Sequence, residues 1–271
     1  MICSLLRGNP RFAVLRRPAR VWAVGAIHGD ARRLAGMHGA LAERVEPEDR
    51  IVYLGNVLGR GRQIPEAIDE LLAFRVAVLA RPNALVTDVA MLHGSQEEMW
   101  QKLFELHFAV NPLEVLEWMA DQGLAATVAA YGGNMRDGYS AARSGPVAVT
   151  RWANGLRANF NANPGHRDFL SALRRAAYSD DGSLLFVAAG IDPSRPLDTQ
   201  KDAFWWSARK FEQIDQPYGE FRRIVRGFDP DHRGVVARDY TLSLDSGCGF
   251  GGSLAAACIA PGGDIVDVIE I

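Results

Sequence analysis

Polar residues follow short apolar runs at five places in the chain, and their side chains are of types that bind metals or transfer protons. They are His28, Asn56, His93, Asp192 and Asp229, and each lies within two residues of a glycine. Imidazole and carboxylate groups bind divalent metals and act in acid–base catalysis, and glycine lets the backbone approach a ligand closely. Ligands of α/β proteins lie beyond the carboxyl ends of the strands, so we expect these loops to form the functional site.

The elements that carry these loops alternate apolar runs with segments of helical periodicity. The apolar runs predict strands at 21–25, 51–54, 76–79, 184–187, 224–225, 241–244 and 265–269. The helical pattern covers 31–45, 64–74, 95–108, 113–122, 147–159 and 167–178. Strands and helices alternate early and strands crowd together late, which predicts a layered α/β fold with central mixed sheets flanked by helices.

The domain organisation follows from length and local composition. A chain of 271 residues, 48% of them hydrophobic, can bury one large core, and we expect a single domain over residues 21–271. The first 20 residues contain five arginines and predict a basic arm, with the folded body starting near Arg20. Residues 111–163 are mostly helical in pattern, with a glycine-rich break at 131–134, and predict an insertion that caps one edge of the sheet.

Charge and cysteine content limit the classes of function. The 30 lysine and arginine residues against 32 aspartate and glutamate residues give a net charge of −2, which disfavours nucleic-acid binding. Cys3, Cys248 and Cys258 are too few and too unevenly spaced for a disulfide framework, and we expect Cys248 and Cys258 to pack as reduced thiols. No apolar run has the length of a signal peptide core or a membrane span, so we expect a cytoplasmic protein without a membrane partner.

The loops occur in an order that resembles the calcineurin-like metallophosphatases, especially the bacterial serine/threonine phosphatases and the diadenosine tetraphosphatases. The resemblance covers about residues 21–271 and rests on six blocks in the family's order rather than on one motif. The matching residues are Gly25, Ile27-His28-Gly29, Gly55, Arg60-Gly61, Gly94, Glu97, Gly190-Ile191-Asp192-Pro193, Gly227, Pro230, Leu244-Asp245-Ser246-Gly247 and Gly251-Gly252-Ser253-Leu254. It implies a layered metallophosphatase fold.

The same resemblance implies that the chemical groups of the family are mostly lost. Of the six metal positions only His28 is unchanged, and the family's other ligands are replaced by Ala26, Asn56 (for the bridging aspartate), Ser95, Ala188 and Phe228. The histidine that protonates the leaving group corresponds to Gln96, and the aspartate that orients it corresponds to Gly59. We therefore expect no catalytic residues and no metal.

The physical reason lies in what two-metal hydrolysis requires. Two cations held close together clamp the phosphate and activate a water, and they need carboxylate and imidazole ligands. Alanine and phenylalanine offer no lone pair, asparagine lacks the charge of a bridging carboxylate, and glutamine cannot exchange a proton near neutral pH. We expect the Phe228 ring to fill the former metal cavity.

A phosphate-binding pocket remains a hypothesis because Arg60 corresponds to a family residue that contacts the substrate phosphate. A guanidinium binds phosphate without a metal, and His28, Asn56, Gln96 and Glu97 complete the predicted vestigial pocket. Structural roles are the alternatives: His28 as a hydrogen-bonded loop residue, Asn56 as a turn residue, and Arg60 as the ion-pair partner of Glu97 or Asp245.

Three functions remain open from the sequence. The first is a pseudophosphatase that acts as a binding or regulatory module for a protein partner or a phosphorylated ligand. The second is a divergent phosphoesterase, acting on phosphoproteins or dinucleotide polyphosphates, with manganese or another divalent ion held by shifted ligands among His28, Asp30, His93 and His232. The third is a structural or oligomerising protein. The pair Trp205-Trp206 is expected to pack in the core or at its rim, or to anchor a partner if exposed.

Overall fold

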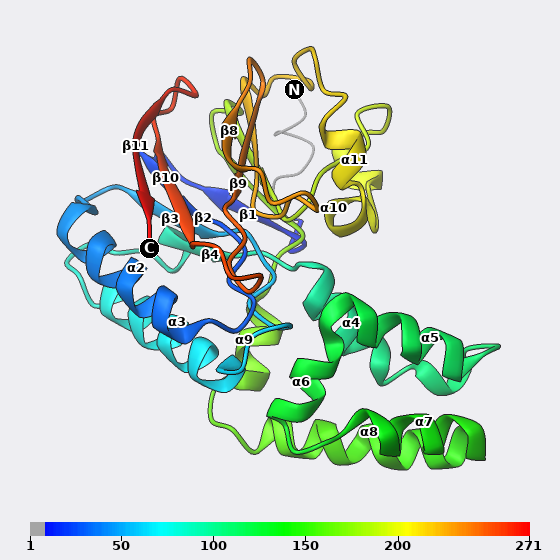
Figure 1. Cartoon of the computed structure of the whole chain (residues 1–271). Helices are drawn as coiled ribbons and strands as arrows, with labels where there is room; N and C mark the ends of the chain where they lie inside the picture. Colours follow the sequence, from blue (N-terminus) through cyan, green and yellow to red (C-terminus); the bar gives the residue numbers. More distant parts are fainter. Residues whose placement is uncertain (1–8) are drawn as a thin grey trace.

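Two β-sheets packed face to face form the centre of the protein, as described by a computed structural model for residues 9–271 (Figure 1). The first sheet has six strands in the order β1-β5-β6-β7-β9-β8, and the second has five in the order β11-β10-β2-β3-β4. Parallel and antiparallel neighbours occur in both sheets, which confirms the predicted mixed α/β layers.

The strands are short and mostly buried. Those of the first sheet are β1 (Phe12–Leu15), β5 (Ala176–Ser179), β6 (Leu184–Val187), β7 (Arg223–Arg226), β9 (Thr241–Asp245) and β8 (Gly234–Ala237). Those of the second are β11 (Ile265–Glu270), β10 (Ala255–Ile259), β2 (Val21–Val24), β3 (Arg50–Tyr53) and β4 (Val89–Met91). Alternate side chains from the two sheets meet in one apolar layer that includes Val52, Leu54, Leu184, Phe186 and Val225.

Helices cover the outer faces and form a separate lobe. Helices α2 (Ala31–Arg44) and α3 (Ile64–Leu79) pack on the second sheet, and α10 (Ala203–Trp206) and α11 (Ala208–Phe211) on the first. A helical lobe projects from the sandwich and consists of α4 (Ser95–Leu103), α5 (Pro112–Met119), a π-helical turn η3 (Ala120–Leu124), α6 (Ala125–Ala130), α7 (Met135–Ser144) and α8 (Pro146–Asn161). Helix α9 (His166–Ala172) leads back into β5, and three short 3-10 turns are η1 (Val86–Asp88), η2 (Leu106–Phe108) and η4 (Leu197–Thr199).

Two secondary-structure predictions were wrong. The apolar run 76–79 is the last turn of α3 and not a strand, because its β-branched residues continue the periodicity of that helix. The predicted helix 167–178 ends at Ala172, and its last residues form β5.

The predicted basic arm was also partly wrong. Residues 12–15 form β1, which pairs in parallel with β5, and Phe12 and Leu15 are buried. The folded body therefore begins before Arg20, because this short apolar run between arginines supplies an edge strand. Residues 1–8 of the predicted arm lie outside the described residues.

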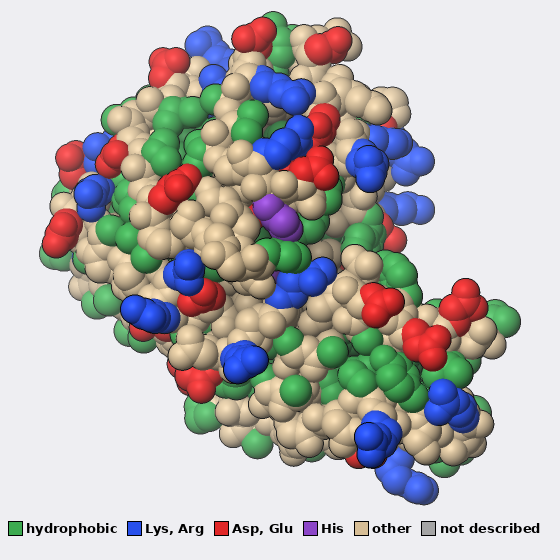
Figure 2. Space-filling model, viewed as in Figure 1, with side chains coloured by type: hydrophobic (Ala, Val, Ile, Leu, Met, Phe, Trp, Pro, Cys, Tyr) green, Lys and Arg blue, Asp and Glu red, His purple; other side chains and the backbone are tan. Residues whose placement is uncertain are grey.

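The surface shows no large region of one charge on the face seen in Figure 2, where basic and acidic side chains are interspersed. Among residues 9–271, no helix has both the length and the apolar character needed to cross a bilayer.

Candidate functional site

The loops predicted to carry the site converge at one edge of the sandwich, beyond the carboxyl ends of β2, β3, β4, β6 and β7. Backbone hydrogen bonds join them directly: His28 N–H donates to Asn56 C=O over 2.7 Å, and Ala26 N–H donates to Gly227 C=O over 3.0 Å. The N–H of Phe228 donates to Ala188 C=O over 2.9 Å. The positions of the lost metal ligands are thus gathered in space as the resemblance implies.

Glu97 holds these loops together and does not face a ligand. It is fully buried, and its two carboxylate oxygens accept backbone hydrogen bonds of 2.9 Å each from Asn56, Leu58 and Gly94. Burial raises the pKa of Glu97, an effect that the three amide donors oppose. The prediction that Glu97 belongs to a ligand pocket or pairs with Arg60 is therefore wrong, because backbone amides occupy both oxygens.

Asn56 lies in the loop after β3, and its side chain caps the start of α4. Its φ of 52° is left-handed, a conformation that asparagine tolerates well. Its Oδ1 accepts from Ser95 Oγ at 3.2 Å and from the Gln96 N–H at 3.1 Å. Asn56 and Ser95, two positions that the resemblance aligns with metal ligands, bind each other and cap the amino end of α4.

His28 lies in an aromatic enclosure instead of a ligand set. Both of its ring nitrogens are buried without a hydrogen-bond partner, and its ring centre lies 6.0 Å from that of Phe228 and 5.3 Å from that of Phe250. Burial, together with the charges of Arg60 and His232, lowers the pKa of His28 to about 3, so the ring is neutral near pH 7. Sequence reasoning missed Phe250, which follows a glycine-rich turn.

Gln96 stands at the position that the resemblance aligns with the family's acid–base histidine. Its Nε2 donates to the Gln122 carbonyl over 2.8 Å, while its Oε1 is buried without a partner. Gly59 has a φ of 83°, and a Cβ there would lie 2.2 Å from Gln96 Oε1. The glutamine therefore packs over the glycine where the family has a histidine and its orienting aspartate.

Arg60 lies half-buried at the junction of the sandwich and the helical lobe. Its guanidinium carbon lies 4.3 Å above the centre of the Phe250 ring, and its Nε is buried without a partner. Its backbone N–H donates to the Gly123 carbonyl of the lobe over 3.3 Å. The predicted ion pair of Arg60 with Glu97 or Asp245 does not form, so its hydrogen-bonding capacity remains available to a ligand.

A cleft of about 430 Å³ opens beside these residues. It is lined by Arg60, Ser95, Gln96, Gln122, Trp205, Trp206, Ser207, Ala208, Arg209, Lys210, Phe228 and Pro230, a set that includes three cations and no acid. Lys210 is paired with Asp192 at 2.6 Å, outside the lining. Phe228 thus forms one wall of this cleft, whereas Ala26, His28, Asn56 and Ala188 are buried and do not line it. The expectation that the Phe228 ring fills the former metal cavity stays a prediction.

The two adjacent tryptophans have different environments. Trp205 is buried, and its ring centre lies 4.9 Å from that of His93. Trp206 is 43% exposed, and its ring centre lies 5.5 Å from that of the exposed Trp118 on α5. Trp205 therefore packs as core, while Trp206 and Trp118 join α10 to the lobe at the rim of the cleft.

The fallback metal ligands are not brought together. Asp30 accepts from the Arg33 N–H at the start of α2 and pairs with the Arg33 side chain. His93 lies against Trp205, and His232 Nδ1 lies 2.9 Å from Asp245 Oδ2. In residues 9–271, one group of three possible ligands has atoms close enough for one ion, and it contains none of these residues.

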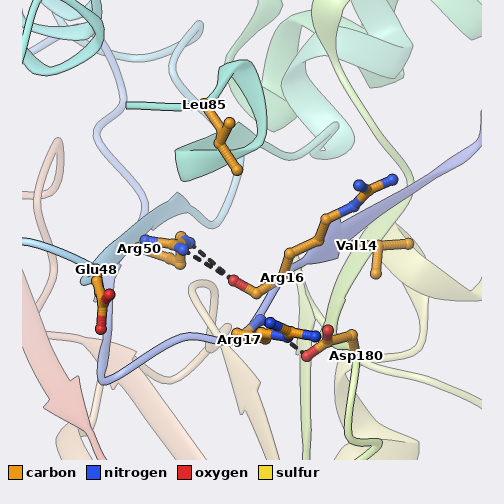
Figure 3. A pocket seen from close by; sticks show the side chains of 7 residues that line it. All are labelled: Val14, Arg16, Arg17, Glu48, Arg50, Leu85 and Asp180. Atoms are coloured by element: carbon orange, nitrogen blue, oxygen red, sulfur yellow. Dashed lines mark hydrogen bonds between the residues drawn. The ribbon is translucent and has the colours of Figure 1, made fainter. Parts of the chain in front are cut away.

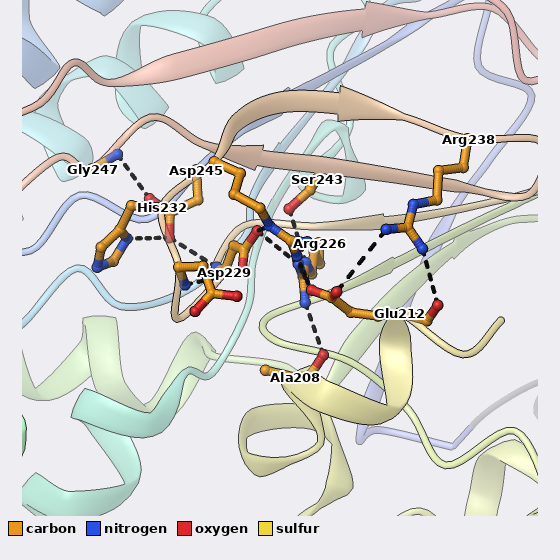
Figure 4. Close-up of polar contacts among 11 residues, drawn as sticks. Ala208, Glu212, Arg226, Asp229, His232, Arg238, Ser243, Asp245 and Gly247 are labelled. Carbon is orange, nitrogen blue, oxygen red and sulfur yellow. Dashed lines mark hydrogen bonds and ion pairs between the residues drawn. The ribbon is translucent and has the colours of Figure 1, made fainter.

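That group consists of Glu212, Asp229 and Asp231, and arginines already compensate two of its members (Figure 4). The fully buried Arg226 contacts Glu212 at 3.1 Å and Asp229 at 3.0 Å. Arg233 pairs with the same two carboxylates. We assign this cluster a structural role, since its ion pairs are centred on the buried Arg226 and Asp229.

The donor set therefore does not fit the pair of divalent ions that the fold family holds. At the six positions, Ala26, Ala188 and Phe228 have no donor atom, and the Asn56 and Ser95 oxygens bind each other. Only His28 presents a ligand atom without a protein hydrogen bond, the one unprotonated nitrogen of its neutral ring, and aromatic rings flank it. No catalytic step can be assigned to metals at this site.

Two of the buried histidines, His28 and His93, predict a pH dependence of stability. Burial lowers the pKa of His28 to about 3 and, together with the charge of Arg175, that of His93 to about 4, against 6.5 for the free side chain. Between about pH 6.5 and 4 the unfolded chain binds protons that the folded protein does not. The contribution of these histidines to the free energy of unfolding is therefore fully present above pH 6.5 and falls as the pH drops.

We expect each of these histidines to contribute a slope of about 1.4 kcal/mol per pH unit to the free energy of unfolding in that range. Urea denaturation from pH 7 to 4.5 measures it, with His28→Asn as the comparison because asparagine tolerates the left-handed φ of 51°. An equal slope in the variant would contradict a neutral buried His28.

Comparisons with known proteins identify the fold. Neither a protein-family model nor a curated protein matches the sequence. Among solved structures, one assigned provisionally as a diadenosine tetraphosphatase matches 95% of this chain and 97% of its own, with a TM-score of 0.53 and 18% identity. A serine/threonine phosphatase from Saccharomyces cerevisiae matches 100% of this chain and 85% of its own, with a TM-score of 0.50 and 13% identity.

A cold-active protein-tyrosine phosphatase of a psychrophilic Shewanella species matches in the same way. The match covers 94% of this chain and 81% of that one, with a TM-score of 0.50 and 12% identity. At these identities the likeness confirms the metallophosphatase fold that the loop order predicts. Activity has to be argued from the residues of this chain.

Proposed function

We propose that this protein is a pseudophosphatase: a binding module that uses the cleft of a metallophosphatase fold to hold a phosphate-bearing ligand without hydrolysing it. The observation that carries the proposal is the environment of His28, a neutral imidazole with free ring nitrogens beside Phe228 and Phe250. A ligand residue without partner ligands cannot hold two ions, whereas the adjoining cleft keeps uncompensated positive charge.

Phosphate recognition is assigned to Arg60, with Ser95 and Gln96 lining the same cleft. Guanidinium groups bind phosphate through charge-assisted hydrogen bonds that need no metal. Arg60 is held in place by its backbone bond to Gly123 and by the Phe250 ring, so less side-chain entropy is lost on binding. This rigidity favours a binding role for a group that no longer serves hydrolysis.

We expect protein purified with added manganese to contain far less than one equivalent of metal and to show no hydrolysis of nitrophenyl phosphate. Mass spectrometry of metal content and an absorbance assay measure both. Chelator-sensitive turnover that His28→Ala abolishes would overturn the proposal in favour of a divergent phosphoesterase.

Calorimetry with phenyl phosphate tests the binding role. Arg60→Ala is expected to weaken binding about tenfold or more, since a charge-assisted contact contributes about 1.5–3 kcal/mol. Arg151→Ala, an exposed arginine on α8, is the matched control and should bind as the parent protein does. Equal binding by the two variants would remove Arg60 from the site.

A further inference from the structure

A second basic hollow lies at the opposite end of the sandwich from the cleft. The cleft adjoins the carboxyl ends of β3 and β6. This hollow instead adjoins Arg50, the first residue of β3, and Asp180, which follows β5. Because β5 is antiparallel to β6, Asp180 lies near the amino end of β6. The volume of the hollow is about 740 Å³, and Figure 3 shows Arg16, Arg17 and Arg50 on its walls. It is therefore independent of the proposed phosphate site.

An adjoining hollow of about 360 Å³ shares Val14 and Arg16 with the first. Together they form one feature along β1, which we call the arginine groove. The smaller part is lined by three arginines and, among the described residues, by no acid: its lining is Asn9, Pro10, Phe12, Ala13, Val14, Arg16, Arg75, Val86, Thr87, Val89, Ala90, Met91, Ala172 and Arg174. The larger part also contains Glu48 and Asp180, so the groove as a whole has five arginines against two acids. On a protein of net charge −2 this is a local excess of positive charge that would attract an anionic ligand.

The guanidinium groups of the groove differ in how far the protein satisfies them. Arg50 is fully engaged, because it donates to the Arg16 carbonyl and pairs with Asp88 at 3.1 Å. Arg174 is fixed by hydrogen bonds to carbonyls at the end of α9. In contrast, the side chains of Arg16 and Arg75 have no partner in the described part of the chain, and Arg75 Nε is buried.

The groove also exposes the free edge of a sheet. Strand β1 is the last strand of its sheet, and its Arg11 and Leu15 carbonyls accept hydrogen bonds on the β5 side from Arg175 and Asp180. Because strand residues alternate in direction, the N–H and C=O of the intervening Val14 point away from β5. Val14 lines both hollows, so a strand edge that no other strand of residues 9–271 pairs with faces the cations.

We infer that the arginine groove binds an extended acidic peptide segment of a partner protein along β1. Carboxylates of the peptide would pair with Arg16 and Arg75, since guanidinium groups bind carboxylates through two parallel hydrogen bonds. Apolar residues between the acids would contact the exposed Val86, and the peptide backbone would pair with Val14 as an added strand. Alternation of acidic and apolar residues is the pattern that such a surface selects.

The test uses fluorescence anisotropy with a short labelled peptide of alternating glutamate and valine. Arg16→Glu and Arg75→Glu are each expected to weaken binding about tenfold or more, because each reverses the charge at a carboxylate contact. Arg151→Glu carries the same charge change on α8, far in the fold from the groove, and should bind normally. Arg60→Ala should also bind normally, which separates this inference from the proposed function.

A second readout reports strand addition. Hydrogen exchange at the Val14 amide is expected to slow when the peptide binds. Binding that survives both groove variants, or that a peptide of alternating lysine and valine matches, overturns the inference. Charge-dependent binding without protection of Val14 also overturns it, because the groove would then be a site for small anions.

Discussion

Glu97→Ala is expected to lower the free energy of unfolding by about 3–5 kcal/mol, the largest effect of any single substitution in the site. Removal of the carboxylate leaves the buried amides of Asn56, Leu58 and Gly94 without their acceptor. Each unsatisfied buried amide costs about 1–3 kcal/mol, and relief of the buried charge offsets part of the sum. Urea denaturation at neutral pH measures the loss.

Two companion variants make this result specific. Glu97→Gln keeps one acceptor oxygen and should lose less stability than the alanine variant. Glu117→Ala, at an exposed position on α5, should remain within about 0.5 kcal/mol of the parent protein. A loss below about 1 kcal/mol in Glu97→Ala would mean that water replaces the carboxylate and that the loops are held by other contacts.

The position of Glu97 explains how the loops keep their arrangement without metals. In a two-metal site the ions themselves hold ligands from several loops together. Here a buried carboxylate, the Asn56–Ser95 contact and backbone bonds between loops perform that task. These contacts would preserve the shape of the cleft in the binding role that we propose.

Much of the fold could be predicted because short stretches of sequence indicate where its strands and helices begin and end. The glycine and polar residues after β2, β3, β4, β6 and β7 mark where strands end, and their order along the chain specifies the topology. Strands with weak local signals were missed. Strand β10 (Ala255–Ile259) begins with three alanines, a residue with little strand preference, and owes its conformation to pairing with β2 and β11.

The site was predictable to a lesser extent, because the surroundings of each of its side chains are set by residues far away in the sequence. The resemblance located His28, Asn56, Arg60 and Gln96 correctly in one region. It could not show that Phe250, which lies within a glycine-rich turn, packs beside His28 and under Arg60. Nor could spacing alone show that Glu97 is used entirely by backbone amides, since those donors come from two other loops.

Gly59→Asp, which restores the family's residue, is expected to destabilise the protein by about 2–4 kcal/mol. Gly59 has a φ of 83°, and a Cβ would lie 2.2 Å from Oε1 and 2.4 Å from Cδ of Gln96. Gln96 cannot easily move away, because its Nε2 is bound to the Gln122 carbonyl. Thermal or urea denaturation measures the loss.

The double variant Gly59→Asp with Gln96→Ala identifies the cause. Removing the glutamine side chain should relieve the steric part of the stability loss and leave only the backbone strain at position 59, about 1 kcal/mol. The effects of the two substitutions on the free energy of unfolding will therefore not be additive. Gly155→Asp is the control, since a Cβ at this α8 position meets no atom within 4 Å. Additive losses would contradict a direct steric coupling. If the coupling holds, positions 59 and 96 form one packed unit, and a return to acid–base chemistry would require both to change together.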